Sequence, residues 1–518
     1  MKYNLISFLL LFFLTLFLSA CRSSTGNYVF KSSIPDNPKT LDPQCALSSS
    51  SYPIIYNVFQ GLFTYNENGE IVNGMIDDFY ISEDGLVWTF NIKKNVMWSD
   101  GDEFKAECTA YDYVFAFQRL FKPETMSERA GEFYIIKNAE KINKGKITDY
   151  SQLGVKASDK YTLEITLEKP YSNLKALLTL PPAMPCNEEF FISTEGRYGL
   201  AADCVASNHN FYVHTWSYDK WSSDNNYFIL RRNSTNIIED NLPSGVNFFI
   251  DPENEFKEFK EETLSVYSGK TMDETYDLIN KYDYLTFDTG VWGIIFNMDS
   301  EFSDYKYRIA LADYVEFTNE NEIYRSIERI VPDCINIGED VYSSITDVSA
   351  KYQNITDSNV GRLTSKRFIM PQNSGLRTNI SNILQDWQSE RGFYCNISEL
   401  DNEDYLKALN IGAFDIALVK LSGEYNSPYA YLNNFINGNY ENFSRYKNKK
   451  YEHIINSALT STTDKDAMAF YSEAEQLLID NGVFIPLCVE TEYMFISGKI
   501  SDIWYNPFSM VYSCRNKE

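Results

Sequence analysis

Few side chains in this sequence stand in a pattern that catalysis or metal binding would need. The chain has three histidines, and its one metal-like cluster is Cys204, His209 and His214, each five residues after the last. These intervals do not place ligands one helical turn apart, and they match no common zinc pattern. We therefore expect three polar residues near a turn, with metal binding as the alternative.

Catalytic signatures are also missing from the sequence. The motifs G-x-S-x-G, H-E-x-x-H, G-x-x-x-x-G-K-[ST] and G-x-G-x-x-G do not occur. The sequence therefore has no local motif for an activated nucleophile, a metal-bound water or a phosphate-binding loop. The 72 acidic residues could include a pair that cleaves glycosidic bonds, but their spacing singles out no pair. The sequence favours a protein without catalytic residues or cofactor, and a secreted glycan hydrolase is the alternative.

Cys21 carries the most specific chemistry. It ends the tetrapeptide LSAC, which closes an uncharged run at 5–20. The apolar core of this run, 6–18, is shorter than the ~20 residues that span a bilayer. LSAC resembles the bacterial lipobox, in which a signal peptidase cuts before a cysteine that carries lipid. The alternative is an uncleaved N-terminal helix, because Lys2 is the only basic residue before the run.

The lipobox implies a signal peptide at 1–20 and an extracytoplasmic protein held at the cell membrane by lipid on Cys21. Residues 22–28 are small and polar and predict a tether before a globular part that starts near Val29. No later segment approaches eighteen uncharged apolar residues. The formal charge of −26 argues against nucleic acid and against electrostatic docking on anionic lipid, so the lipid must provide the anchor.

A chain of 518 residues predicts two to four domains or lobes. Eight cysteines follow Cys21, none of them in a C-x-x-C pair. An extracellular location permits disulfides, but eight cysteines are too sparse to form the framework of so long a chain. One or two bridges remain open, and Cys186 and Cys204 are the nearest pair in sequence.

Alternation and turn signals predict strands, hairpins and helices along the chain. A hairpin is predicted at 65–72, because its Asn68-Gly69 pair accepts the positive φ values of a tight turn. Alternating apolar and polar residues predict strands at 87–92 and 161–167, and Thr109 can cap a helix that runs to Pro123. The apolar stretch 54–63 predicts a helix that runs until Gly61. The other predicted elements are helices at 379–389, 402–409 and 470–478 and strands at 393–397 and 414–419. The stretch 233–283 shows little period.

Five motifs near the N-terminus share order, spacing and composition with one family. They are KTLDP at 39–43, QGLF at 60–63, SEDGLVWTF at 82–90, WSDG at 98–101 and TAYDYV at 109–114. Together they resemble the N-terminal signature of the family 5 extracellular solute-binding proteins, the oligopeptide and dipeptide receptors of ABC importers. The likeness continues at 153–157, 161–167, 412–417 and 471–478 and covers about two-thirds of the chain.

The resemblance implies an α/β fold of the periplasmic-binding-protein type, enlarged to three lobes. Lobe I would combine 21–60, 175–287 and 487–518, lobe II would be 61–174, and lobe III would be 288–486. Two lobes would close on the ligand by a hinge motion. The implied protein is a monomer that captures a short peptide and delivers it to the membrane subunits of an ABC permease.

In peptide receptors of this family an aspartate in a W-x-x-D-Y-x-x-P motif binds the α-ammonium of the ligand. The matching run, 421–428, keeps Tyr425 but has Leu421 in place of Trp and Glu424 in place of Asp. The extra methylene moves the charge by roughly a C–C bond length, and an exposed turn residue is the alternative for Glu424. The ligand-binding residues that the resemblance implies are Glu424, Tyr425, Ser48, Ser49, Ser50 and, more weakly, Tyr134.

Two further stretches depart from the family. SNHNFY at 207–212 replaces the usual N-G-P/A-Y turn, and the helix that normally ends in a leucine pair and glycine is not found between 331 and 366. We expect lobe III to be trimmed or divergent. These departures keep two alternatives open: a surface lipoprotein that acts as sensor or adhesin, and a receptor for nickel or another small solute.

Overall fold

The structure is a computed structural model. It describes residues 28–516 except 48–49, 67, 222–224, 236–241, 252–253, 319, 338–339, 351, 353–362, 364, 373, 509 and 511. Several predicted features therefore lie outside the described residues. They are the signal peptide at 1–20, the lipidation site Cys21 and two ligand contacts, Ser48 and Ser49. Within the described part, no helix is long and apolar enough to cross a membrane.

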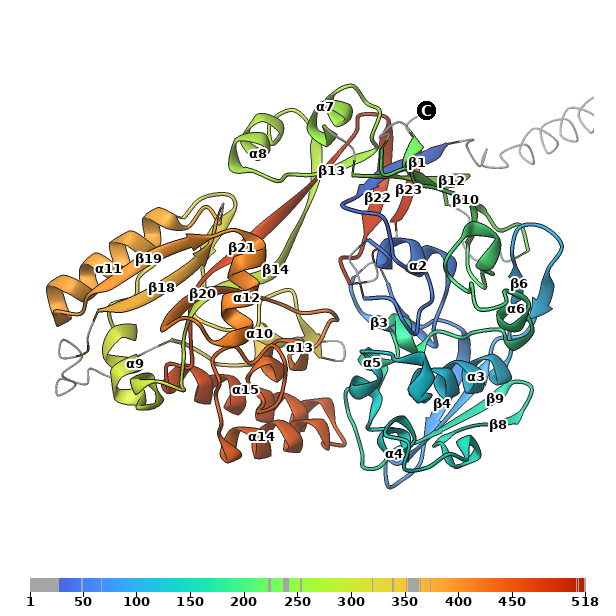
Figure 1. The fold of residues 1–518 in the computed structure, drawn as a ribbon, viewed down its shortest axis with the longest axis horizontal. Helices are drawn as coiled ribbons and strands as arrows, with labels where there is room; N and C mark the ends of the chain where they lie inside the picture. The colour runs from blue at the N-terminus through green and yellow to red at the C-terminus, as the bar shows by residue number, and fades with distance from the viewer. Residues whose placement is uncertain are drawn as a thin grey trace, which may run out of the picture.

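A four-stranded sheet lies at the upper right of Figure 1. Its strands in order are β1 (Val29–Ile34), β12 (Gly245–Ile250), β11 (Tyr227–Arg232) and β10 (Phe211–Ser217). β1 and β12 pair in parallel although they are far apart in sequence. This sheet therefore joins the N-terminal part of the chain to a segment some two hundred residues later.

The helix predicted from Ile54 until Gly61 begins and ends earlier in the structure, where α2 spans Tyr52–Val58. The side chain of Asn208 binds both backbone groups of Gln60: it accepts from the amide at 3.0 Å and donates to the carbonyl at 3.1 Å. Phe59 is already extended. The unusual SNHN sequence thus ends α2 early by a tertiary contact.

The 61–174 segment forms a second sheet, covered by a helix. The strands in order are β4 (Ile76–Ile81), β5 (Val87–Ile92), β9 (Thr162–Thr166) and β8 (Val155–Asp159). β5 has the predicted bounds, and Trp88, Phe90 and Ile92 are its buried residues. α3 (Ala110–Phe121) begins at the predicted cap, where Thr109 and Asp112 form a capping box. The predicted hairpin is also confirmed, as β2 (Phe63–Tyr65) and β3 (Ile71–Asn73).

The third sheet fills the left part of Figure 1. Its strands in order are β13 (Val266–Ser268), β21 (Phe484–Ile496), β14 (Asp283–Phe296), β20 (Ile416–Ser422), β18 (Lys366–Pro371) and β19 (Cys395–Leu400), and β15 (Tyr324–Ser326) pairs with β21. β18 is parallel to both β19 and β20. The connecting helices are α11 (Arg377–Arg391) and α12 (Asn402–Ile411), so the predicted α/β alternation is confirmed.

Short helices and hairpins complete the described chain. The remaining helices are α4 (Ala139–Asn143), α5 (Leu174–Leu177), α6 (Glu188–Ser193), α7 (Glu255–Lys260), α8 (Met272–Leu278), α9 (Tyr305–Ala312), α10 (Tyr342–Ile345), α13 (Tyr429–Leu432), α14 (Lys449–Leu459) and α15 (Asp464–Asp480). The remaining strands are β6 (Met97–Ser99), β7 (Lys105–Glu107), β16 (Asn336–Ile337), β17 (Asp340–Val341), β22 (Ile500–Tyr505) and β23 (Tyr512–Asn516). Between 331 and 366 the described residues contain only α10 as a helix.

Two long strands, β14 and β21, run from the left part of the molecule to its top in Figure 1. They pair antiparallel, and their register shifts between Phe287 and Gly290. At Gly290 a Cβ atom would lie 2.0 Å from Cε of Lys420, which crosses β14 there to reach Glu490 and Glu492 of β21. The lobe boundaries expected from sequence, 287/288 and 486/487, fall inside these two strands.

Candidate functional site

Glu424 lies in the turn between β20 and α13, where Tyr425 and Asn426 follow it. Tyr425 and Asn426, like Glu424, contact residues of the 61–174 segment. We call residues 424–426 the latch. It joins the left and right halves of Figure 1 at the level of α13.

The Glu424 carboxylate is already paired in the structure. Its Oε2 accepts from Nη2 of Arg129 at 2.5 Å. The Arg129 side chain is 6% exposed, whereas that of Glu424 is 55% exposed. Arg129 also binds Glu132 through Nε and Nη2, both at 2.8 Å, and donates to the hydroxyl of Tyr52. Arg129, Glu132 and Tyr52 were not predicted from sequence, because no motif or periodic pattern marks them.

A third carboxylate, Glu441, belongs to the same electrostatic group. Burial raises its pKa, a hydrogen bond from Tyr440 lowers it, and the negative charges of Glu424 and Glu132 raise it further. Arg129 opposes this effect. Three carboxylates therefore interact with one guanidinium, and the resulting excess of negative charge favours a further cation.

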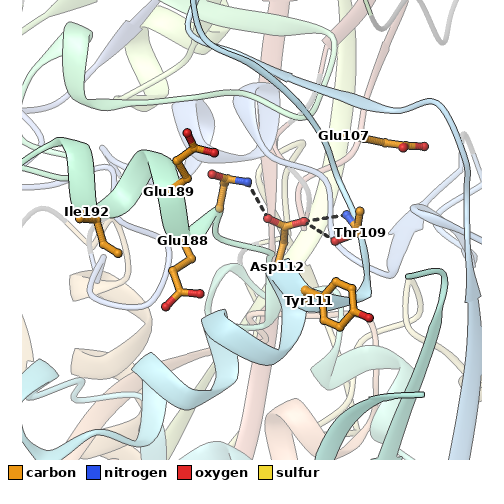
Figure 2. Close-up of a pocket in the computed structure, with 8 residues that line it drawn as sticks. Glu107, Thr109, Tyr111, Asp112, Glu188, Glu189 and Ile192 are labelled. Atoms are coloured by element: carbon orange, nitrogen blue, oxygen red, sulfur yellow. Dashed lines mark hydrogen bonds between the residues drawn. The ribbon is translucent and has the colours of Figure 1, made fainter. Parts of the chain in front are cut away.

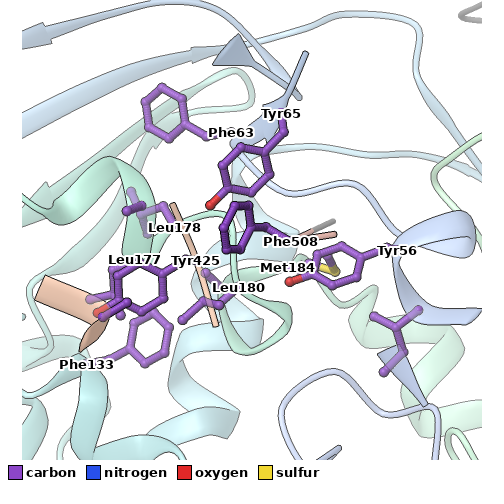
Figure 3. Packing of buried hydrophobic residues seen from close by; sticks show 14 of the residues in the cluster. Tyr56, Phe63, Tyr65, Phe133, Leu177, Leu178, Leu180, Met184, Tyr425 and Phe508 are labelled. Carbon is purple, nitrogen blue, oxygen red and sulfur yellow. The ribbon is translucent and has the colours of Figure 1, made fainter. Parts of the chain in front are cut away.

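Tyr425 is buried in an apolar cluster. Figure 3 shows its ring beside Leu177 of α5 and Phe133 of the 61–174 segment. Its hydroxyl accepts a hydrogen bond from Nδ2 of Asn173 at 3.4 Å. In this conformation Tyr425 packs the latch against the other half, so contact with ligand stays a prediction.

Asn426 holds the latch through polar contacts. Its amide donates to the hydroxyl of Tyr65 at 3.2 Å, and its Nδ2 donates to the carbonyl of Gly69 at 2.7 Å. Its Oδ1 accepts from the amide of Asn336 at 2.7 Å. Gly69 is the positive-φ residue of the predicted β2–β3 turn, so that turn presents its carbonyl to the latch.

Ser50 and Tyr134 are the other predicted ligand contacts that the structure describes. No hydrogen bond or ion pair found in the structure joins either of them to Glu424. Ser50 is buried, and its hydroxyl accepts from the amide of Asp36 at 3.2 Å. Tyr134 donates to Oδ1 of Asn143 in α4 at 2.6 Å, within its own segment. Both side chains have structural partners, and their contact with ligand remains a prediction.

The Cys204, His209 and His214 cluster does not form a metal site. Among the described residues no group of three or more His, Cys, Asp or Glu side chains could hold a metal ion. Cys204 and His209 are buried, whereas His214 is exposed on β10. The seven cysteines that the structure describes, including Cys186 and Cys204, are free thiols.

His209 is expected to make the unfolding free energy depend on pH. Burial lowers its pKa to about 4, so the folded protein keeps it neutral while the unfolded chain binds a proton near pH 6.5. Its contribution to stability is therefore complete above pH 6.5 and is lost as the pH falls toward 4. We expect the drop in melting temperature between pH 7 and pH 5 to be smaller in His209→Gln than in wild type. His214→Gln is the control, and equal drops in all three proteins would contradict the assignment.

Another part of the structure, where α3 and α6 begin, contains a hollow. It has a volume of about 520 Å³ and is lined by Glu107, Thr109, Tyr111, Asp112, Asn187, Glu188, Glu189 and Ile192. Figure 2 shows Asp112 bound to Thr109 and to the amide side chain of Asn187, which donates at 2.9 Å. The Asp112 carboxylate thus serves the helix cap, and none of the sequence-predicted ligand contacts lines this hollow.

Comparison with known proteins points to one family. The sequence model of the bacterial extracellular solute-binding proteins, family 5 (middle part), matches residues 70–314. Over this segment the chain is similar to that family. The periplasmic murein peptide-binding protein MppA of Escherichia coli K12 is 25% identical over 520 residues, which cover 93% of this chain and 91% of MppA.

Solved structures show the same fold. The structure of the E. coli murein tripeptide-binding protein MppA matches with a TM-score of 0.72 and 21% identity, covering 95% of this chain and 99% of MppA. Listeria monocytogenes OppA bound to peptide matches with a TM-score of 0.70 and 20% identity, covering 95% of this chain and all of that one. The predicted α/β periplasmic-binding-protein fold is therefore confirmed.

Proposed function

We propose that this protein is a lipid-anchored, monomeric receptor that captures short peptides between its lobes and delivers them to the permease of an ABC importer. Similarity to the solute-binding family supports the receptor role. Relatives that match most of the chain support the ligand class, since MppA is named for murein peptides and OppA of L. monocytogenes for a bound peptide. The observation that carries the proposal is the excess of carboxylates around Glu424.

The lobe division expected from sequence suits a hinged receptor. β14 and β21 connect the 288–486 segment to the rest of the chain, and their register shift lies at the 287/288 boundary. A β-bulge interrupts the ladder of hydrogen bonds and bends the strand. We propose this shift as the hinge about which the 288–486 segment rotates.

The charge balance supports recognition of an α-ammonium. Glu132, Glu424 and Glu441 carry one positive partner, Arg129, in the described surroundings. In the ion pair with Arg129, the Glu424 side chain is the more exposed of the two, so an incoming group can reach it. Charge-assisted hydrogen bonds are stronger than neutral ones and give orientation as well as affinity.

Removal of the Glu424 charge is expected to abolish most of the preference for free amino termini. A mixed tripeptide library, half of it N-acetylated, is incubated with the purified full chain, and retained peptides are counted by mass spectrometry. We define amine selectivity as the ratio of free to acetylated peptides retained. In Glu424→Gln this ratio should fall about tenfold, because a hydrogen bond to a charged group contributes about 1.5 kcal/mol.

The control for this experiment is Glu140→Gln. Glu140 also forms a 2.5 Å ion pair, with Lys144, but both side chains are exposed and lie on one helix. An unchanged selectivity in Glu424→Gln would remove Glu424 from the site. Retention of no peptide by wild type would contradict the peptide receptor.

A second candidate is a surface receptor that binds without transport. It is favoured by the pairing of Glu424 with Arg129, because a ligand ammonium then meets an occupied carboxylate. Uptake of a retained peptide by cells that carry or lack the protein distinguishes the two roles. Uptake that depends on the protein supports delivery to a permease.

A further inference from the structure

Arg129 is held from both halves of the molecule. Glu132 and Tyr52, which bind its guanidinium through three hydrogen bonds, belong to the right half of Figure 1. Glu424 follows β20 of the left half and accepts from Nη2 at 2.5 Å. If the halves separate, the guanidinium stays with Glu132 and Tyr52, and only its bond to Glu424 breaks.

Glu424 is the exchangeable partner of this pair. The Glu132 carboxylate binds Arg129 by two parallel hydrogen bonds and compensates its charge. When Glu424 leaves, Glu132 still compensates the charge of Arg129. The high cost of an unpaired buried charge is therefore avoided. A pair with one side exposed to solvent contributes little by itself, so another cation can compete for Glu424.

We propose that Arg129 is a specificity-determining residue that competes with the ammonium group of the ligand for Glu424. This inference rests on the proposed function. Without ligand, Arg129 holds the latch against the 61–174 segment. A peptide with a free amino terminus must displace or share this guanidinium, so Arg129 reduces the affinity gained from a free amine. N-blocked peptides make no such exchange.

The rest of the latch allows Arg129 to act on selectivity rather than on the fold alone. Tyr425 packs beside Leu177, and Asn426 binds Tyr65 and Gly69, none of which contacts Arg129 through a hydrogen bond found in the structure. These contacts keep the Glu424 backbone in place when the guanidinium is removed. Glu424 is then free to bind the ligand.

The test uses a double variant, Arg129→Met/Glu132→Gln, which removes the guanidinium without leaving the Glu132 carboxylate unpaired. We expect amine selectivity toward the mixed tripeptide library to rise about two- to fivefold, the range of an exposed ion pair. We also expect faster hydrogen exchange at amides 424–427 in the ligand-free protein. Lys144→Met/Glu140→Gln is the matched control, and neither quantity should change in it.

Each outcome decides the inference. A rise in selectivity with faster exchange supports it. Unchanged selectivity, or equal losses of free and acetylated peptides, overturns it, because a purely structural arginine would affect both classes alike. If wild type retains no peptide, the proposed function fails, and exchange at 424–427 then decides whether Arg129 holds the latch: unchanged rates overturn that role.

Discussion

Replacement of Asp42 by alanine is expected to lower the free energy of unfolding by about 3 to 5 kcal/mol. Asp42 belongs to the KTLDP motif, and its carboxylate forms a buried ion pair with Arg119 of α3. Arg119 Nη1 also donates to Oε1 of Gln44 at 2.8 Å. Burial alone would lower the pKa of Arg119, but Asp42, together with smaller effects of Cys186 and Tyr198, raises it above its ordinary value. Without Asp42 a buried guanidinium would lose its counter-charge.

Urea unfolding followed by tryptophan fluorescence measures this effect. The control is Asp203→Ala, because Asp203 pairs with Arg197 at 3.7 Å and both side chains are exposed. We expect a lower midpoint for Asp42→Ala and no measurable shift for the control. Equal midpoints for wild type and Asp42→Ala would show that Arg119 finds compensation elsewhere.

Replacement of Cys21 by alanine is expected to release nearly all of the protein from membranes. The proposed anchor is lipid on Cys21, and two acyl chains hold a protein far more firmly than one. A surface with a formal charge of −26 provides no second, electrostatic attraction to anionic lipid. The membrane-bound fraction and the incorporation of labelled palmitate should therefore fall together.

Cys334→Ala is the control for this variant, because Cys334 is exposed and free. It should keep both the membrane fraction and the palmitate label. If Cys21→Ala stays at the membrane as fully as wild type and wild type takes up no palmitate, the lipobox interpretation is wrong and an uncleaved N-terminal helix explains the anchoring.

Local pattern was sufficient for elements whose hydrogen bonds lie within a few residues. β5 spans the predicted residues 87–92, and α3 begins at the predicted cap, Thr109. Ile380, Ile383, Leu384 and Trp387, in the helix predicted at 379–389, are buried in α11. The helix predicted until Gly61 ends earlier, at Val58, and Asn208 from another part of the chain binds Gln60 just after it.

The stretch 233–283 shows the opposite case. It contains β12, α7, β13 and α8, although its sequence has little period. β12 pairs with β1 and β11, and β13 with β21, so the partners that stabilise these strands are mostly distant in sequence. Tertiary pairing overrides weak local preference here.

The sequence by itself determined the family resemblance, the α/β class and the position of the carboxylate that the resemblance assigns to ligand. These properties follow from contiguous motifs and short-range periodicity. Only the tertiary structure decided that Glu424 meets Arg129, which lies 295 residues away, and that Tyr425 is buried beside Leu177. It also buried Cys204 and His209 while leaving His214 exposed. Ion pairs between distant segments depend on how whole lobes pack, and residue spacing along the chain holds no record of that packing.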